Sequence, residues 1–451
     1  MQSRSAIGRC VVIAALVVVS GCITPSAHAV SPPPIDPSRL PPPAPARPPL
    51  PTVQRETCAT LSMTRGVDST QLSGLDLQQV WKLTTGSGQR VAVIDTGVSS
   101  HPRLPHLTAG GDYVSAGNGT QDCDGHGTAV AGIIGAAADP THADAFSGVA
   151  PGVELISVRQ SSTKFGAVAD ATNSGFGDVD TMARAVRTAA DLGATVINIS
   201  SVACARGEAA LDDRPLGAAL AYAVDIKNVV VVAAAGNTGS GQCPEGQAGS
   251  TVIVSPAWYD DFVLTVGSVN ARGEPSSFSM AGPWVDVAAP GEGVISLSSS
   301  GTGLANAIAA QDRPAPLSGT SYAAPVVSGL AALIRSRFPT WTARQVMQRI
   351  KATAHHPPSR WDPQVGAGRV DALAAVSTDT PTTPAAPPTR KSAPVASPVR
   401  AAAPDRRAQR AAIAGATICG AASVGVLTFG ALRSRLRRAG RSGNERNVMC
   451  D

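Results

Sequence analysis

Three short segments of the sequence carry an acid, a base and a nucleophile at points where a strand would give way to a loop or a helix would begin. They are VAVIDTGV around Asp95, GHGTAVAGIIG around His126 and SGTSYAAPVVSG around Ser321. Such a set can activate the serine hydroxyl for attack on a carbonyl, even when its members lie far apart in sequence. The three segments therefore predict the active site of a serine protease.

Asp95 ends an apolar run and begins the turn Asp-Thr-Gly. Functional groups in open α/β sheets collect at the carboxyl ends of strands, where a carboxylate can accept the Nδ1 hydrogen of a histidine and stabilise the imidazolium. Asp-Thr-Gly also occurs in aspartic proteases, and Asp95 alone could be a turn residue. The sequence lacks the second DTG or DSG that a single-chain carboxylate dyad needs.

His126 is flanked by Gly125 and Gly127 and starts a segment with apolar residues at helical spacing. A histidine at a helix start, with a backbone that can bend tightly around it, can direct Nε2 at a nucleophile. The other histidines (His28, His101, His106, His142, His355 and His356) lack this setting, and we interpret them as surface or loop residues.

Ser321 opens a helix whose first turn contains Pro325, a position that proline tolerates. The helix start offers amide donors to a developing oxyanion. Asn237 ends the apolar run VVVVAAAGN, and its side-chain amide could be a second donor. The alternatives are an N-cap role for Ser321 and a turn role for Asn237.

The elements that must position these side chains follow an alternating pattern from Arg90 to Val376. Apolar β-rich runs throughout, with helical segments between them, predict an α/β domain with a mostly parallel sheet covered by helices on both faces. The expected strands are 91–94, 155–158, 196–199, 229–232 and 263–266, and the expected helices are 128–138, 180–192, 216–226, 322–338 and 342–353.

Taken together, the DTG, HGTxVAG, AAAGN and GTSxAAP segments resemble those of subtilisin-like (S8 family) serine proteases, in which the triad also has the order Asp, His, Ser. The resemblance covers residues 85 to 376. It implies a three-layer subtilisin-like domain, Asp95 as orienting acid, His126 as general base, Ser321 as nucleophile, and Asn237 with the Ser321 amide as oxyanion donors. It implies no cofactor, and the calcium loops of secreted subtilisins are not evident, so no metal is assigned.

The same resemblance implies where a peptide binds, along Ile199, Ser200 and Ser201, with Val202 and Gly236 at the primary specificity pocket. Many subtilisins have glycine where this chain has Val202. We expect the branched side chain to narrow the pocket and to favour a small substrate residue before the cleaved bond.

The first 29 residues read as an export signal, with Arg4 and Arg9 ahead of an apolar run. Cleavage after Ala29 is preferred. The alternatives are a lipobox that would place a lipid on Cys22 and an uncleaved N-terminal anchor. Apart from the signal region, the apolar stretch at 410–432 and the C-terminal tail, the chain has four cysteines, which for an exported chain predict two disulfides with three possible pairings. The preferred pairing is Cys58–Cys123 with Cys204–Cys243, and four free thiols is the alternative.

Segments without a core pattern flank the predicted domain. Residues 30–84 are an extension with a Pro-rich start, expected to stay attached and to pack on the domain. Residues 377–409 are a Pro/Ala/Thr-rich linker. Residues 410–432 would span a bilayer, because the stretch from 411 to 432 is apolar and uncharged, and residues 433–451 form a basic tail. The N-terminus and the protease would then lie outside the cytoplasm and the tail inside, with a buried soluble helix as the alternative for the span.

This arrangement resembles that of mycosins, membrane-anchored proteases of mycobacterial type VII secretion systems. It implies an endopeptidase that cuts exported proteins, with protein or peptide substrates and membrane components of a secretion complex as partners. The alternative is an assembly subunit with catalysis secondary. The net charge of +5 on 451 residues, without a basic stripe interleaved with aromatics, argues against nucleic-acid binding.

Overall fold

The computed structural model of the protein describes residues 31–64, 71–141, 143–170, 175–206, 211–241, 243–245, 252–309 and 313–377. All of them belong to one compact unit of the chain. The predicted signal peptide, the span at 410–432, the tail and the linker beyond Ser377 lie outside the described residues. Among the residues that are described, no helix combines the length and apolar character needed to cross a bilayer.

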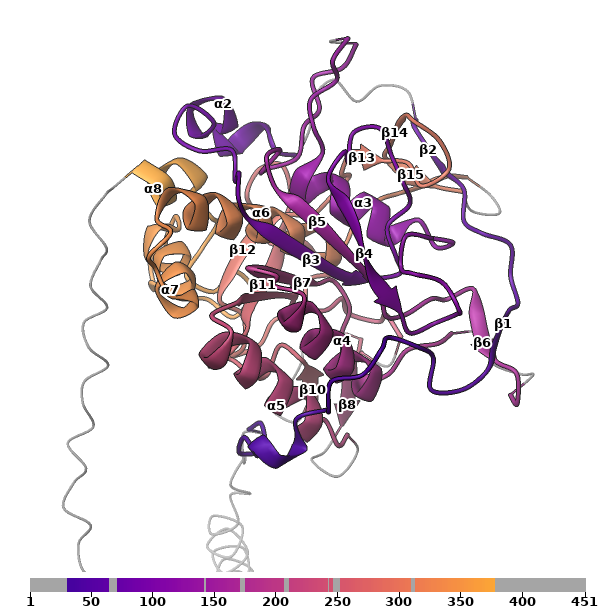
Figure 1. Ribbon diagram of the computed structural model, residues 1–451. Coiled ribbons are helices and arrows are strands. Elements are labelled where there is room, and N and C mark those ends of the chain that lie inside the picture. The colour runs from indigo at the N-terminus through magenta and orange to yellow at the C-terminus, as the bar shows by residue number, and fades with distance from the viewer. Residues whose placement is uncertain are drawn as a thin grey trace, which may run out of the picture. The chain divides into compact units, whose positions relative to one another are not determined.

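A seven-stranded sheet forms the centre of the unit (Figure 1). All its neighbouring strands run parallel, which is the arrangement expected for strands that are apolar on both faces. In spatial order they are β12 (Val287–Pro290), β11 (Leu264–Val269), β9 (Val230–Ala234), β7 (Val196–Ile199), β3 (Arg90–Asp95), β5 (Glu154–Arg159) and β4 (Leu107–Asp112).

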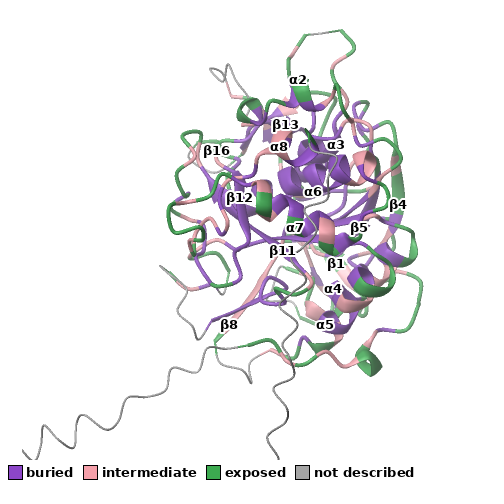
Figure 2. Ribbon diagram, turned by 90° about the vertical axis from the view of Figure 1, so that its left-hand side faces the viewer, coloured by how far each residue is buried: buried purple, intermediate pink, exposed green. Residues whose placement is uncertain are grey.

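Helices cover both faces of this sheet (Figure 1). On one face, α3 (His126–Gly135) packs against α6 (Thr320–Arg337), which crosses β7, β9, β11 and β12. Both helices are apolar nearly all round, so they lie inside the molecule, as the buried colouring of Figure 2 shows. On the other face, α4 (Val179–Asp191) and α5 (Arg214–Ala221) pack together.

Capping residues explain where two of the helices begin. Asp178 caps α4 and forms a capping box with Thr181, and Thr342 does the same with Gln345 at the start of α7 (Ala343–Thr353). Helix α5 continues into a π-helical turn, Tyr222–Ile226. The short helix α8 (Ala372–Ser377) packs against α6 and α2 (Leu77–Val80).

The N-terminal extension adds short elements around the domain. They are a 3₁₀ turn (Pro37–Arg39), β1 (Thr52–Gln54), β2 (Leu61–Ser62), a second 3₁₀ turn (Ser73–Leu75) and α2. Strand β1 pairs antiparallel with β6 (Phe165–Ala167). Strand β2 pairs with β15 (Ala307–Ile308), which also pairs with β16 (Ala315–Pro316). The extension is therefore held at two separate places along the chain.

Two further strand pairs complete the described structure: β8 (Ala203–Arg206) with β10 (Val252–Ser255), and β13 (Ser296–Leu297) with β14 (Leu304–Ala305). The five predicted strands and five predicted helices are all present. The strand at 196–199 has its predicted ends, the others differ at one or both ends, and α3 begins at His126 rather than at residue 128. The sequence reading missed β4 and β12 at the edges of the large sheet and the short strands outside it.

Candidate active site

Asp95 and His126 meet at the carboxyl edge of the sheet. Asp95 is the last residue of β3 and His126 the first of α3, and the Asp95 Oδ1 atom lies 2.7 Å from His126 Nδ1. Asp95 is 2% exposed, and its Oδ1 also accepts a hydrogen bond from the Thr96 amide. The buried carboxylate can therefore fix the orientation of the imidazole and leave Nε2 for another partner.

The two glycines beside His126 have separate structural causes. Gly125 precedes α3 with φ +77°, a conformation that favours glycine. A Cβ atom on Gly127 would lie 2.0 Å from the Gly97 carbonyl oxygen and 3.1 Å from the Asp95 Cβ. The absence of side chains at these two positions lets the start of α3 turn sharply and approach the end of β3.

Asp122 holds this junction together and was missed in the sequence reading, although it stands close before the GHG motif. Its Oδ1 accepts hydrogen bonds from Thr96 Oγ1 and the Gly125 amide, at 2.8 Å each. Its Oδ2 accepts from the amide and the hydroxyl of Thr128. Burial raises the pKa of Asp122 to about 6 in spite of these hydrogen bonds.

Ser321 and Asn237 converge on one point from different elements. A Cβ atom on Gly319 would lie 3.0 Å from Ser321 Oγ and 3.2 Å from Asn237 Nδ2. Asn237 Oδ1 accepts from the amide and the hydroxyl of Thr320, at 3.0 Å each. These bonds fix the side chain so that its NH₂ group, rather than its oxygen, faces the nucleophile.

Ser321, Asn237 and His126 line the same cavity, which measures about 750 Å³. His126 also contacts the ring of Tyr322, with centroids 5.1 Å apart and planes tilted by 45°. The described residues thus place an imidazole oriented by a carboxylate, a hydroxyl at a helix start and an amide donor around one open space. This arrangement can support acyl transfer through a serine nucleophile.

The charge environment of His126 favours its protonated form. Burial alone lowers the pKa of His126, but the Asp95 carboxylate opposes it, with further contributions from Asp122 and Asp124. The net result is a pKa above the ordinary value of 6.5. Stabilising the imidazolium is what a general base needs once it has accepted a proton.

The predicted substrate-binding residues line the same cavity, except for Ile199, which is buried in β7. A Cβ atom on Gly236 would lie 3.4 Å from Val202 Cγ2, so the Val202 side chain lies directly against Gly236 in the cavity wall. Within the described part of the chain, the buried Ser201 Oγ has no hydrogen-bond partner. The structure therefore places four of the five predicted residues, Ser200, Ser201, Val202 and Gly236, at one cavity.

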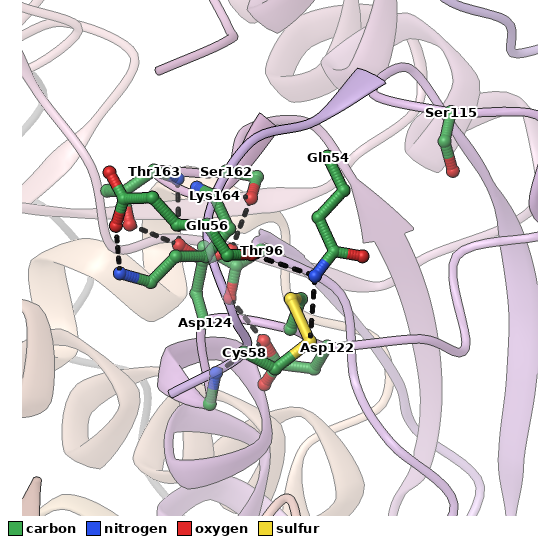
Figure 3. The surroundings of a disulfide bond; sticks show 12 residues. Gln54, Glu56, Cys58, Thr96, Ser115, Asp122, Asp124, Ser162, Thr163 and Lys164 are labelled. Carbon is green, nitrogen blue, oxygen red and sulfur yellow. Dashed lines mark hydrogen bonds and ion pairs between the residues drawn. A yellow bond between two sulfur atoms is a disulfide. The ribbon is translucent and has the colours of Figure 1, made fainter. Parts of the chain in front are cut away.

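Both disulfides of the preferred pairing are present in the structure. Cys58 is joined to Cys123, with Cα atoms 4.5 Å apart, and Cys204 to Cys243, with Cα atoms 5.0 Å apart. The first links the extension to the loop before His126 (Figure 3). The second lies in the wall of the active-site cavity. Among the described residues no group of three or more His, Cys, Asp or Glu side chains is placed to hold a metal ion.

Comparison with known proteins agrees with this geometry. Residues 86–372 match the model of the subtilase family, Peptidase_S8, so the chain belongs to the subtilase family and is a serine endopeptidase. Within that family it is similar to mycosins. It is 62% identical to mycosin-4 of Mycobacterium tuberculosis, over 96% of this chain and 98% of the relative. It is 44% identical to mycosin-1 of Mycolicibacterium smegmatis, over 91% and 96%.

Solved structures of such proteases have the same fold. The MycP3 protease from the type VII (ESX-3) secretion system is 46% identical, with a TM-score of 0.71 over 78% of this chain and 100% of that one. A chain in the periplasmic assembly from the ESX-5 inner membrane complex is 42% identical, with a TM-score of 0.74 over 80% and 97%.

Proposed function

We propose that Asp95, His126 and Ser321 form the catalytic triad of this endopeptidase. The observation that carries the proposal is the 2.7 Å contact between Asp95 Oδ1 and His126 Nδ1 beside a cavity that Ser321 also lines. His126 Nε2 takes the proton of Ser321 Oγ while that oxygen attacks the substrate carbonyl. It then gives the proton to the leaving amine. Water attacks the resulting acyl-enzyme in the same way, with His126 again as the base, and releases the second product.

Asn237 Nδ2 and the Ser321 amide are proposed as donors to the oxyanion of the tetrahedral intermediate. The support is the fixed orientation of Asn237, whose oxygen is occupied by Thr320, and the position of Ser321 in the first turn of α6. Donors held in advance of the reaction stabilise charge where it develops, without reorganisation during the step.

The substrate is proposed to be an exported protein whose chain lies along Ser200 and Ser201, which line the cavity, whereas Ile199 is buried within β7. Val202 beside Gly236 favours a small side chain before the cleaved bond, because a branched side chain occupies part of the cavity there. Cleavage after Phe or Tyr is expected to be poor.

The surroundings of the enzyme are proposed from its relatives and its sequence. One similar protein structure is that of an intact ESX-5 inner membrane complex, whose matching chain is 42% identical with a TM-score of 0.73. The apolar stretch at 410–432, followed by a basic tail, supports a single membrane span. The protease would then be held outside the cytoplasm beside a type VII secretion complex, with the signal peptide removed, the 30–84 extension retained and the 377–409 linker ahead of the span.

Labelling with a serine-directed fluorophosphonate tests the catalytic proposal. The full chain should be labelled, and Ser321→Ala should abolish labelling, because the reagent bonds to Oγ. His126→Ala should reduce labelling strongly, because the hydroxyl loses its base. Labelling that persists in Ser321→Ala would refute the assignment of the nucleophile.

A second function, as an assembly subunit of the secretion complex, is favoured by the similar chains in ESX-5 inner membrane complex structures. The Ser321→Ala variant separates the two functions in cells. Secretion that survives the loss of peptide cleavage would assign export to the assembly role, whereas secretion that stops with cleavage would assign it to the protease.

A further inference from the structure

A second cavity, of about 320 Å³, borders His126. It shares His126, Ser201 and Tyr322 with the cavity that contains Ser321. Its apolar lining comes from Ala59, Leu61, Ile308 and Leu317. Two of these four residues, Ala59 and Leu61, belong to the N-terminal extension.

At this cavity the extension is bonded to two other parts of the chain, the loop before His126 and the strand β15. The Ala59 amide donates to the Cys123 carbonyl oxygen at 2.8 Å, next to the Cys58–Cys123 disulfide. The Ala309 amide donates to the Thr60 carbonyl oxygen at 2.9 Å, and β2 pairs with β15 through Leu61 and Ile308. The wall is therefore anchored covalently and by hydrogen bonds.

The segment before Cys58 is bonded to the part of the cavity rim that contains Thr163 and Lys164. The Arg55 amide donates to the Lys164 carbonyl oxygen at 2.8 Å, and Lys164 Nζ forms an ion pair with Glu56 at 2.8 Å. The buried Asp124 accepts from the Thr163 amide at 2.7 Å, which holds that rim to the loop before His126. Figure 3 shows Glu56, Lys164, Thr163 and Asp124 together near the disulfide.

Leu61 lies directly against the backbone of Gly125, the residue before His126. A Cβ atom on Gly125 would be 2.2 Å from Leu61 Cδ1. Leu61 is 6% exposed, and Ala59 is partly exposed at the cavity. The size of these two side chains therefore sets the space available beside the imidazole.

We propose that Ala59 and Leu61 are specificity-determining residues, with the extension forming one wall of a subsite for an apolar side chain next to the substrate residue that fills the primary pocket. The inference rests on the proposed function, because it takes the cavity lined by Ser321 as the place of cleavage. The cavity adjoins that place through three shared residues. Asp124, Thr163 and Lys164 also line it, but most of its exposed lining is apolar, so a peptide bound for cleavage can extend an aliphatic or aromatic side chain into it. Each methylene that such a pocket accepts or excludes changes kcat/KM by about 10-fold or more.

The test uses the full chain and quenched peptides that vary at the two positions flanking the primary-pocket residue, P2 and P1′. Leu61→Ala enlarges the cavity and should raise kcat/KM for Phe over Val at one of these positions by about 10-fold. Ala59→Leu fills it and should shift the preference at the same position towards Ala by a similar factor. Met63→Ala is the matched control, because Met63 is an exposed apolar residue of the same segment and lines neither cavity. Its preferences should stay within about 2-fold of the unaltered chain.

Fluorophosphonate labelling of every variant separates this inference from the function on which it rests. Labelled, active variants with superimposable preference profiles would overturn the inference and leave the protease assignment standing. An unaltered chain that is neither labelled nor active would overturn both. If Leu61→Ala does not fold, Ala59→Leu decides alone, because it adds a side chain to an open cavity and leaves no void.

Discussion

The Ser200 hydroxyl donates a 2.8 Å hydrogen bond to the carbonyl oxygen of Ser321. Ser200 follows β7, on the proposed substrate-binding segment, and Ser321 opens α6. Asn198 Nδ2 donates to Ser200 Oγ at 2.9 Å, and Ser328 Oγ donates to Asn198 Oδ1 at 2.8 Å. This buried network fixes the position of the nucleophile relative to the segment along which a peptide would bind.

Replacing Asn198 by alanine should disrupt the network. Asn198 and Ser328 are fully buried, so their partners would lose hydrogen bonds without access to water. The free energy of unfolding should fall by about 3 kcal/mol, and kcat/KM by roughly 10-fold or more as Ser200 and Ser321 shift. Urea unfolding and peptide hydrolysis measure the two effects. Ser328→Ala is the milder control, expected at about 1–2 kcal/mol; equal losses in both variants would contradict the central role of Asn198.

Asn237 should contribute to kcat rather than to substrate binding. Asn237→Ala removes the oxyanion donor and should lower kcat by about 100- to 1,000-fold with little change in KM. Asn237→Asp keeps an oxygen that can accept from Thr320 but replaces the donor by a negative charge, and should lose at least as much. Steady-state kinetics of both variants check this. An active Asn237→Asp enzyme would show that the amide is needed only to position Thr320.

Activity should fall with decreasing pH as His126 becomes protonated, with a midpoint above 6.5, because the proposed base must be neutral. The carboxylates near His126 are the cause of this raised pKa, against the effect of burial. Since the folded state binds this proton more tightly than the unfolded state, His126 contributes stability below pH 6.5 that is lost as the pH rises through the folded-state pKa. The pH profile of kcat/KM and an NMR titration of His126 in Ser321→Ala measure the midpoint. A value at or below 6.5 in both would contradict the prediction.

Val202→Gly should widen the primary pocket. Removing the side chain that faces Gly236 should raise kcat/KM for peptides with Phe before the cleaved bond by about 10-fold or more relative to Ala. Competition between the two peptides gives this ratio directly. Efficient cleavage after Phe by the unaltered enzyme would already refute the narrowing.

The ion pair between the half-buried Lys351 and the buried Asp286 should make stability depend on pH. Lys351 Nζ lies 2.9 Å from Asp286 Oδ1, yet burial raises the pKa of Asp286 to about 6. Lys351→Met leaves the carboxylate without its cation and should raise this pKa further. The unfolded state releases the Asp286 proton at lower pH than the folded state, so the loss of stability should grow with pH, to about 3 kcal/mol at pH 8 and less at pH 5.

Urea unfolding at the two pH values tests this dependence. Lys227→Met, which breaks a surface pair with Asp191, is the control and should cost less than about 1 kcal/mol at either pH. A loss in Lys351→Met that is the same at pH 5 and pH 8 would contradict the assignment to Asp286.

The sequence predicted the central strands because their apolar runs need burial on both faces, as β9 illustrates. It missed β4, whose LTAGGD sequence contains two glycines, and β12, whose four residues are Val, Ala, Ala and Pro. Both are edge strands with one neighbour, where pairing with the sheet, rather than residue propensity, makes a strand. The strands of the extension also depend on pairing rather than on residue propensity: β2 is a strand because it pairs with β15.

The triad candidates could be found because their motifs are local and depend on small residues around a functional one. Asp122 and Asn198 could not, because each joins residues near it in sequence to one far along the chain, Thr96 for Asp122 and Ser328 for Asn198. Nothing in the sequence near Asn198 indicates that Ser328, in the middle of α6, will lie against it. In the same way, a lining role for Leu61 depends on the long-range pairing of β2 with β15, which the sequence around Leu61 does not indicate.

The pairing of Leu61 with Ile308 has a consequence for how the enzyme is made. Leu61 is synthesised well before Ile308, because most of the subtilase domain lies between them in the sequence. Closing so long a loop is slow, because chain entropy is lost before the contact forms. The cavity beside His126 is therefore completed late, and a nascent chain carries the proposed catalytic histidine before it has the finished wall that would select a substrate.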